Sequence, residues 1–230
     1  MKTLFSFLLF FLSSIILHAQ DAETLVNQVR AKLAQVKDYK AEGRMKMDVA
    51  FIDAPPSKIA VYFKSPDKFK VKKDGGISIL PKGGISINLG TLLANGEYDV
   101  VPKKDTVLNG KKLKVVRLLP VDENSEVVLT TLYIDEKNLV VIKSTVTTRE
   151  SGSYEIEMSY GKYTAWGLPD KVVFSFNTKD YKLPKGITFE YEKGGKKAAD
   201  LKNKKGKVEI SYSSYIINKG IDNKIFEAAS

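Results

Sequence analysis

The chain has 230 residues, no cysteine, a single histidine at position 18 and a formal net charge of +10 at pH 7. Beyond residue 20 it therefore lacks the residues for a Ser-His-Asp triad, a cysteine nucleophile, a structural zinc site of the usual kind or a c-type haem attachment. Disulfides are excluded as well, so burial of apolar side chains must hold the fold together.

The first twenty residues, MKTLFSFLLFFLSSIILHAQ, have the features of a secretory signal peptide: one early lysine, a long apolar run, then small and polar residues. We expect cleavage after Ala19 or Gln20 and location in the periplasm. No cysteine follows the apolar run to accept a lipid anchor. Residues 21–230 are predicted to form a single domain, and no later segment is predicted to cross a membrane.

One amphipathic helix is predicted at the start of this domain, capped by Asp21. Leu25, Val26, Val29, Leu33 and Val36 recur at helical spacing, with charged residues between them. After Tyr39 the spacing of apolar residues changes to two, which is typical of strands with one apolar face.

About ten or eleven such strands follow, and the Asn109-Gly110 pair is the strongest hairpin signal between them. A sheet of this size twists and curls, and one short helix is too small to cover its apolar face. The fold is therefore mainly β, either a closed barrel filled by side chains or an open one around a helix and a cavity. The predicted strands are 45–51, 59–63, 69–71, 98–101, 113–119, 127–134, 139–148, 154–160, 172–176, 187–191 and 208–212.

The segment 75–97, GGISILPKGGISINLGTLLANGE, interrupts this pattern with a glycine-flanked apolar sequence that carries one charge, Lys82, before Glu97. Residues 88–96 predict a short apolar helix, and the glycines on both sides allow the segment to shift. We interpret the segment as a lid over the apolar concave face. The alternative is a strand pair and a helix packed permanently into the core.

Residues 193–207, KGGKKAADLKNKKGK, hold seven lysines and one aspartate. This segment is either a solvated hairpin tip or a surface that attracts anionic lipid headgroups or an acidic partner. No aromatic residues are interleaved with the lysines, so nucleic-acid binding is not expected.

Catalysis has little support in the sequence. Glu155 and Glu157 share one face of a strand, but that face is predicted to be exposed, so we interpret both as surface charges. Neither Gly76-Ile77-Ser78 nor Gly84-Ile85-Ser86 continues to a nucleophile elbow. A glycosidase that uses carboxylates alone remains an open alternative, without a motif in its favour.

Four stretches in order resemble the LolA-like family of periplasmic lipoprotein carriers over most of the mature chain. They are FKSPDKFKV from Phe63, LYIDEKNLVVIKSTV from Leu132, WGLP from Trp166 and IINKGIDNKIFE from Ile216. The resemblance implies an unclosed antiparallel β-barrel covered by a helical lid, without catalysis or cofactor. It also implies that the cavity takes the acyl chains of lipoproteins, or of another amphiphile, and carries them towards the outer membrane.

The resemblance and the strand pattern together give the candidate site. The cavity wall is expected to include Met45, Met47, Val49, Phe51, Val61, Phe63, Phe69, Ile156, Met158, Phe174 and Phe176. The lid is expected to include Ile85, Ile87, Leu89, Leu92 and Leu93. Contacts with a partner or a lipid headgroup are expected from Arg44, by resemblance to an arginine near the cavity mouth of the carriers, and from Lys196, Lys197, Lys204 and Lys205.

The partners implied are an acylated amphiphile, a transient release complex at the inner membrane, an acceptor at the outer membrane and an anionic membrane surface. No metal and no nucleic acid are expected. A second reading stays open, in which the same fold is an envelope sensor or scaffold that binds a protein through a sheet edge or the lysine-rich segment and transports no lipid.

Overall fold

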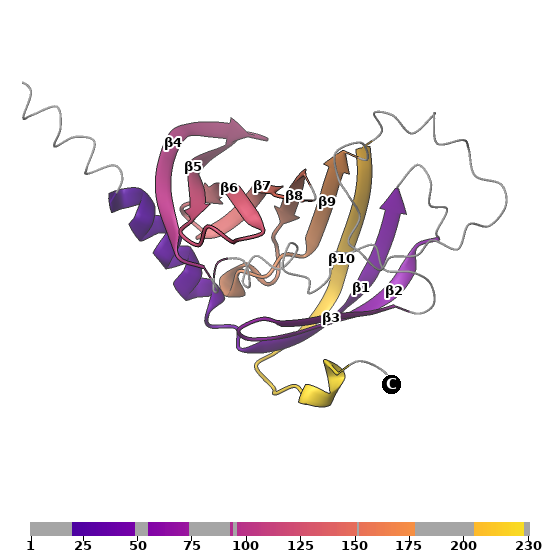
Figure 1. Ribbon diagram of the computed structural model, residues 1–230. Coiled ribbons are helices and arrows are strands. Elements are labelled where there is room, and N and C mark those ends of the chain that lie inside the picture. The colour runs from indigo at the N-terminus through magenta and orange to yellow at the C-terminus, as the bar shows by residue number, and fades with distance from the viewer. Residues whose placement is uncertain are drawn as a thin grey trace, which may run out of the picture.

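The computed structural model of the protein describes residues 20–48, 55–73, 93, 96–150, 152–177 and 205–227. In these residues ten strands form one antiparallel sheet in the order β3-β2-β1-β10-β9-β8-β7-β6-β5-β4, and a helix includes residues 20–33. The two outermost strands, β3 and β4, do not pair with each other, so the sheet is open (Figure 1). The predicted mainly β, unclosed architecture is confirmed, and the alternative of a closed barrel is wrong.

Ten of the eleven predicted strands are present, and the eleventh, 187–191, lies outside the described residues. Two short 3-10 helices, η1 (Thr164–Trp166) and η3 (Asn223–Ile225), follow β8 and β10. The strands are β1 (Asp38–Asp48), β2 (Ser57–Lys64), β3 (Lys68–Lys73), β4 (Tyr98–Leu108), β5 (Lys111–Pro120), β6 (Val127–Asp135), β7 (Val140–Thr148), β8 (Ser153–Ser159), β9 (Lys171–Asn177) and β10 (Lys205–Ile217).

The Asn-Gly hairpin forms as the sequence predicts. Asn109 and Gly110 both have positive φ, 51° and 77°, as the tight turn between two twisted strands requires. The hairpin also extends β4 well beyond the predicted strand 98–101, to Leu108.

Several predicted features lie outside the described residues: residues 1–19 of the signal peptide, nearly all of the lid and lysines 193–204. In the described part, no helix has the length and hydrophobicity needed to cross a membrane. Residue 20 is already helical, so Asp21 lies within the helix and the prediction that it caps the helix is wrong.

The two faces of the sheet differ as the period-two pattern predicts. In β1, Tyr39, Ala41, Met45 and Met47 are buried, while residues 42, 44, 46 and 48 are exposed. Every strand except β3 and β4 contributes buried side chains to one apolar cluster on the concave face, and Val26 and Val29 of the helix belong to it. The sheet therefore wraps around a core that it shares with the helix.

A β-bulge in β10 keeps this face continuous. Glu42 pairs with Ser214 and Gly43 with Tyr212, so Ser213 has no opposite residue. The hydroxyl of Ser213 donates to the carbonyl oxygen of Glu42 at 3.0 Å. A Cβ at Gly43 would lie 2.4 Å from the carbonyl oxygen of Ser211, so only glycine fits opposite the bulge.

The helix is held beside the sheet by polar contacts near its C-terminal end. Lys32 Nζ donates to the carbonyl oxygen of Asn138 in the β6–β7 turn at 2.6 Å, and Arg30 Nη2 donates to that of Gly96 before β4 at 2.8 Å. In Figure 1 the helix lies along the side of the sheet formed by β4 and β5 and leads directly into β1. Asn138 and Gly96 thus tie the helix to the far half of the sheet.

The junction of helix, β1 and the chain after β10 is built around Asp38 and Asn218. Asp38 Oδ1 accepts backbone N–H groups of Lys219 at 3.1 Å and Gly220 at 3.0 Å. Asn218 Oδ1 accepts the N–H of Lys37 at 2.7 Å, and its Nδ2 donates to the carbonyl oxygen of Gln35 at 2.8 Å. We call this set of hydrogen bonds the Asp38–Asn218 clamp.

Candidate functional site

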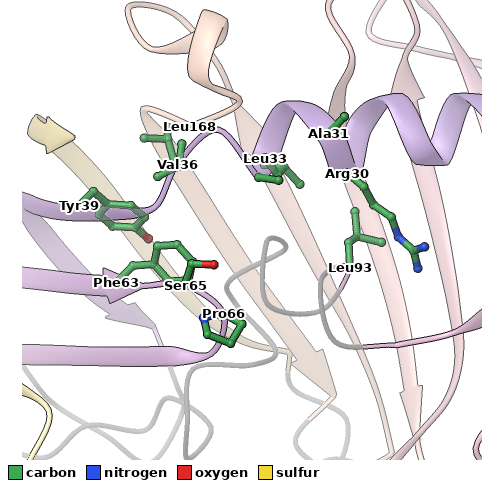
Figure 2. A pocket seen from close by; sticks show the side chains of 11 residues that line it. Arg30, Ala31, Leu33, Val36, Tyr39, Phe63, Ser65, Pro66, Leu93 and Leu168 are labelled. Carbon is green, nitrogen blue, oxygen red and sulfur yellow. The ribbon is translucent and has the colours of Figure 1, made fainter. Parts of the chain in front are cut away.

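A cavity of about 390 Å³ lies between the C-terminal end of the helix and the strands β1 and β2. Its size is at the lower end of the range of ligand pockets, roughly 300–1,000 Å³. Figure 2 shows its side chains in a row, with Tyr39, Phe63 and Pro66 at one end, Leu33 in the middle, and Arg30 with Leu93 at the other. The lining residues are Arg30, Ala31, Leu33, Ala34, Val36, Tyr39, Phe63, Ser65, Pro66, Leu93 and Leu168.

The aromatic end of the cavity is rigidly packed. The ring of Tyr39 lies 5.3 Å from those of both Phe63 and Tyr215, and Tyr215 lies 4.8 Å from Tyr163. The hydroxyl of Tyr215 donates to the carbonyl oxygen of Pro169 at 2.7 Å. Burial raises the pKa of Tyr39 well above its usual value, so its hydroxyl stays neutral. This end of the cavity therefore offers an uncharged aromatic surface.

Arg30 gives the other end a positive charge. Its Nη2 donates to the carbonyl oxygen of Gly96, and its guanidinium lies 5.6 Å from the centre of the Tyr98 ring. Burial raises the pKa of Tyr98, and the charge of Arg30 opposes that rise. In the described part of the chain Arg30 Nε is buried without a hydrogen-bond partner.

Most of the predicted cavity-wall residues lie on the concave face. Eight are buried in the apolar cluster and Phe69 packs against it, while Val49 and Phe51 lie outside the described residues. Among the described ones, Phe63 alone lines the cavity. The eight buried residues are Met45, Met47, Val61, Phe63, Ile156, Met158, Phe174 and Phe176.

Of the five predicted lid residues, the structure describes Leu93, which is 1% exposed and lines the cavity. Ile85, Ile87, Leu89 and Leu92 lie outside the described residues, as do Lys196, Lys197 and Lys204. Lys205 is the first residue of β10.

Arg44 does not lie near the cavity mouth. It is exposed on the convex face, because its neighbour Met45 points into the core and side chains alternate along a strand. Its predicted contact with a partner or a lipid headgroup stays a prediction. Arg30, on the helix, is the arginine that lines the cavity.

Two of the four resemblance motifs meet at the cavity although they are far apart in the sequence. Phe63, Ser65 and Pro66 come from the first motif and Leu168 from the third. Arg30 was not predicted as a site residue, but one signal was available: it follows Val29 and is four residues after Val26, at the border of the apolar stripe.

Among the described residues, the charged groups of the sheet that the sequence singled out form ion pairs on its convex face. Glu155 and Glu157 lie on the convex face, where Lys143 Nζ is 2.8 Å from Glu155 Oε1 and 3.9 Å from Glu157 Oε1, as the surface-charge interpretation expects. Among the described residues no group of three or more acidic, histidine or cysteine side chains is placed to hold a metal ion. Thr130 and Ser144 are fully buried on the concave face, and their hydroxyls have no hydrogen-bond partner in the described part.

No protein-family model matches the sequence, and neither does any curated protein. Three solved structures share the fold. A domain described as an outer membrane lipoprotein-sorting protein, from Vibrio parahaemolyticus, matches with a TM-score of 0.56 at 13% identity over 90% of this chain and 97% of that one. A DUF1329 family protein from Desulfovibrio piger matches with a TM-score of 0.57 at 10% identity over 91% and 97%.

The third structure is a LolA superfamily protein from Nitrosomonas europaea, with a TM-score of 0.53 at 9% identity over 90% of this chain and 97% of that one. All three likenesses extend over about nine-tenths of the chain. At these identities they establish the architecture alone. The open sheet with its N-terminal helix is thus a LolA-like fold.

Proposed function

We propose that this protein is a non-catalytic carrier in the periplasm. It binds an acyl chain of a lipoprotein, or of another amphiphile, in the cavity between the helix and the concave face, and ferries it towards the outer membrane. The observation that carries the proposal is the apolar cavity itself, about 390 Å³, in a fold shared with a domain described as lipoprotein-sorting.

The lining explains how such cargo could bind without specific polar chemistry. Each methylene group that moves from water into an apolar site contributes about 0.8 kcal/mol. Leu33, Val36, Phe63, Leu93 and Leu168 supply such surroundings. Because binding of this kind rests on burial alone, an acceptor that buries more of the acyl chain binds it more tightly and can take it from the carrier.

Ala34 offers a test that leaves the core intact. It is exposed and lines the cavity, so Ala34→Trp should obstruct the entrance without removing a buried side chain. Ala165→Trp is the matched control, since Ala165 is also exposed but does not line this cavity. Native mass spectrometry of protein purified without detergent should show bound amphiphile in the wild type and in Ala165→Trp, and little in Ala34→Trp.

The proposal fails if the purified wild type is empty and also refuses added lipopeptide and phospholipid. Equal occupancy of wild type and Ala34→Trp would place the amphiphile elsewhere on the molecule and would equally contradict the cavity as its site.

The lysine-rich segment 193–207 has a separate role in the proposal, which is to attract the carrier to an anionic membrane surface. Neutralising four of its lysines should weaken binding to anionic vesicles, and the difference should vanish at high salt. Cavity occupancy should not change. The four lysines are Lys196, Lys197, Lys204 and Lys205.

A scaffold that binds a protein through a sheet edge is the second candidate, and β4 favours it. This edge strand exposes Val101 at 41% and Val107 at 62%. A partner strand could pair with such an edge. Under this candidate Ala34→Trp leaves function unchanged, whereas Val107→Lys weakens partner binding.

A further inference from the structure

The cavity has one charged residue in an otherwise mainly apolar lining. Arg30 is the charged residue among those that line it in the described part, and the remaining lining is aliphatic or aromatic apart from the Ser65 hydroxyl. A guanidinium carries five N–H donors. Arg30 uses Nη2 on the carbonyl oxygen of Gly96, while its buried Nε has no acceptor in the described part. The group thus has unused donors.

The charge of Arg30 is also unbalanced. None of the ion pairs among the described residues includes it. Removing a charge from water without a partner is unfavourable, and the contact with the Tyr98 ring offsets part of that cost. An anion placed against Nε would balance the charge and use the free donor, with the planar geometry in which guanidinium binds carboxylate or phosphate.

The arrangement of the cavity separates this charge from the apolar end. Chain order places Arg30 on the helix, Leu33 one turn further, and Tyr39 in β1. Figure 2 shows the same sequence of side chains from Arg30 to Tyr39 and Phe63. A ligand that fits must therefore be charged at one end and apolar along the rest.

We infer that the cavity selects a single-chain acidic amphiphile, with its carboxylate or phosphate on Arg30 and its acyl chain running past Leu33 to Tyr39 and Phe63. This inference deepens the proposed function and rests on it. The cavity volume of about 390 Å³ suits one chain, since it is at the lower end of the pocket range, roughly 300–1,000 Å³.

Three probes have the same number of carbon atoms in the chain and differ in the head group: palmitate, hexadecyl phosphate and the uncharged hexadecanol. Differences in their affinities therefore report the contribution of the head group and not that of chain burial. Charge-assisted hydrogen bonds are about twice as strong as neutral ones, so the wild type should bind at least one anionic probe about tenfold or more tightly than hexadecanol. The tighter of the two anions identifies the head group. Titration calorimetry or competition with a fluorescent fatty acid measures all three.

Arg30→Gln should abolish the preference for the anion, measured as the ratio of the affinities for the anion and for hexadecanol in the same variant. Measurable binding of hexadecanol also shows that the variant is folded and that its cavity is open. Lys32→Gln is the matched control, because Lys32 lies on the same helix, bonds to Asn138 and does not line this cavity. It should keep the wild-type preference.

Three outcomes overturn the inference, and they can be told apart. If the wild type binds hexadecanol as tightly as both anions, Arg30 selects no head group, while the carrier function stands. If the wild type binds none of the three probes, the proposed function fails and the inference fails with it. A preference that survives in Arg30→Gln assigns the selection to another residue and also contradicts the inference.

Discussion

The Asp38–Asn218 clamp should contribute measurably to stability, and Asp38→Ala tests it. Asp38 is 9% exposed, and its Oδ1 accepts two backbone N–H groups, from Lys219 and Gly220. Both donors belong to the chain after β10, while Asp38 opens β1. The substitution therefore removes two bonds between the start of β1 and the chain after β10, while the backbone N–H of Asn218 still donates to the carbonyl oxygen of residue 38.

The magnitude follows from these two bonds. A hydrogen bond to a charged group contributes about 1.5–3 kcal/mol when buried. Lys219 and Gly220 are exposed, so water replaces part of what is lost, and we expect a total of about 2–3 kcal/mol. For a chain of this size each kcal/mol lowers the melting temperature by roughly 2–4 °C, which gives about 4–12 °C. Asp38→Asn, which keeps an acceptor, should lose about half as much.

Urea unfolding followed by circular dichroism, together with thermal melting, measures both quantities. Asp222→Ala is the control, because Asp222 is exposed and accepts one backbone N–H, from Lys224 at 3.0 Å, at the start of η3. Loss of such a cap costs about 1 kcal/mol. If Asp38→Ala is no more destabilising than Asp222→Ala, the reasoning about the clamp is refuted.

Three further predictions concern the core and its surroundings. Thr130→Val and Ser144→Ala should each raise the free energy of unfolding in urea by about 1 kcal/mol, because each removes a buried hydroxyl that has no partner among the described residues. A loss of stability would mean that the hydroxyl has a partner. Gly167→Ala should lower the free energy of unfolding more than Gly110→Ala does. Both glycines have positive φ, but a Cβ at Gly167 would also lie 3.1 Å from the side chain of Leu33 on the helix. Equal losses for the two variants would contradict that contact. Burial raises the pKa of Tyr212 above its ordinary value of 10.0, so its neutral hydroxyl contributes stability that is fully present below pH 10 and is lost as the pH rises further. Tyr212→Phe should therefore flatten the fall in unfolding free energy above pH 10. An unchanged slope would exclude this tyrosine as a cause.

The strands were predictable because the period-two pattern is local. In β9, for example, Val172, Phe174 and Phe176 are buried, and the residues between them are partly exposed. The Asn109-Gly110 turn was equally clear, since its backbone conformation is a property of the two residues themselves.

The cavity was not predictable in detail because residues from distant parts of the sequence form it. Leu33, Phe63 and Leu168 come from segments that meet only when the sheet has curled and the helix has docked. The period-two pattern predicts which face of each strand is buried, but it does not predict where the side chains on that face leave a cavity. Arg30 was passed over because a charged residue on an amphipathic helix normally belongs to the solvent side.

The bulge at Ser213 compensates a change of phase in the apolar pattern of β10. Val208, Ile210 and Tyr212 are at even positions and pair with the inward-facing side of β1, whereas Tyr215 and Ile217 are at odd positions and pair with Ala41 and Tyr39 on that same side. If Ser213 paired regularly instead of bulging, it would lie opposite Glu42, and Tyr215 and Ile217 would turn to the convex face. The bulge thus takes up the one residue by which the two halves of β10 are out of phase, and it keeps the aromatic residues on both sides of Ser213 on the concave face.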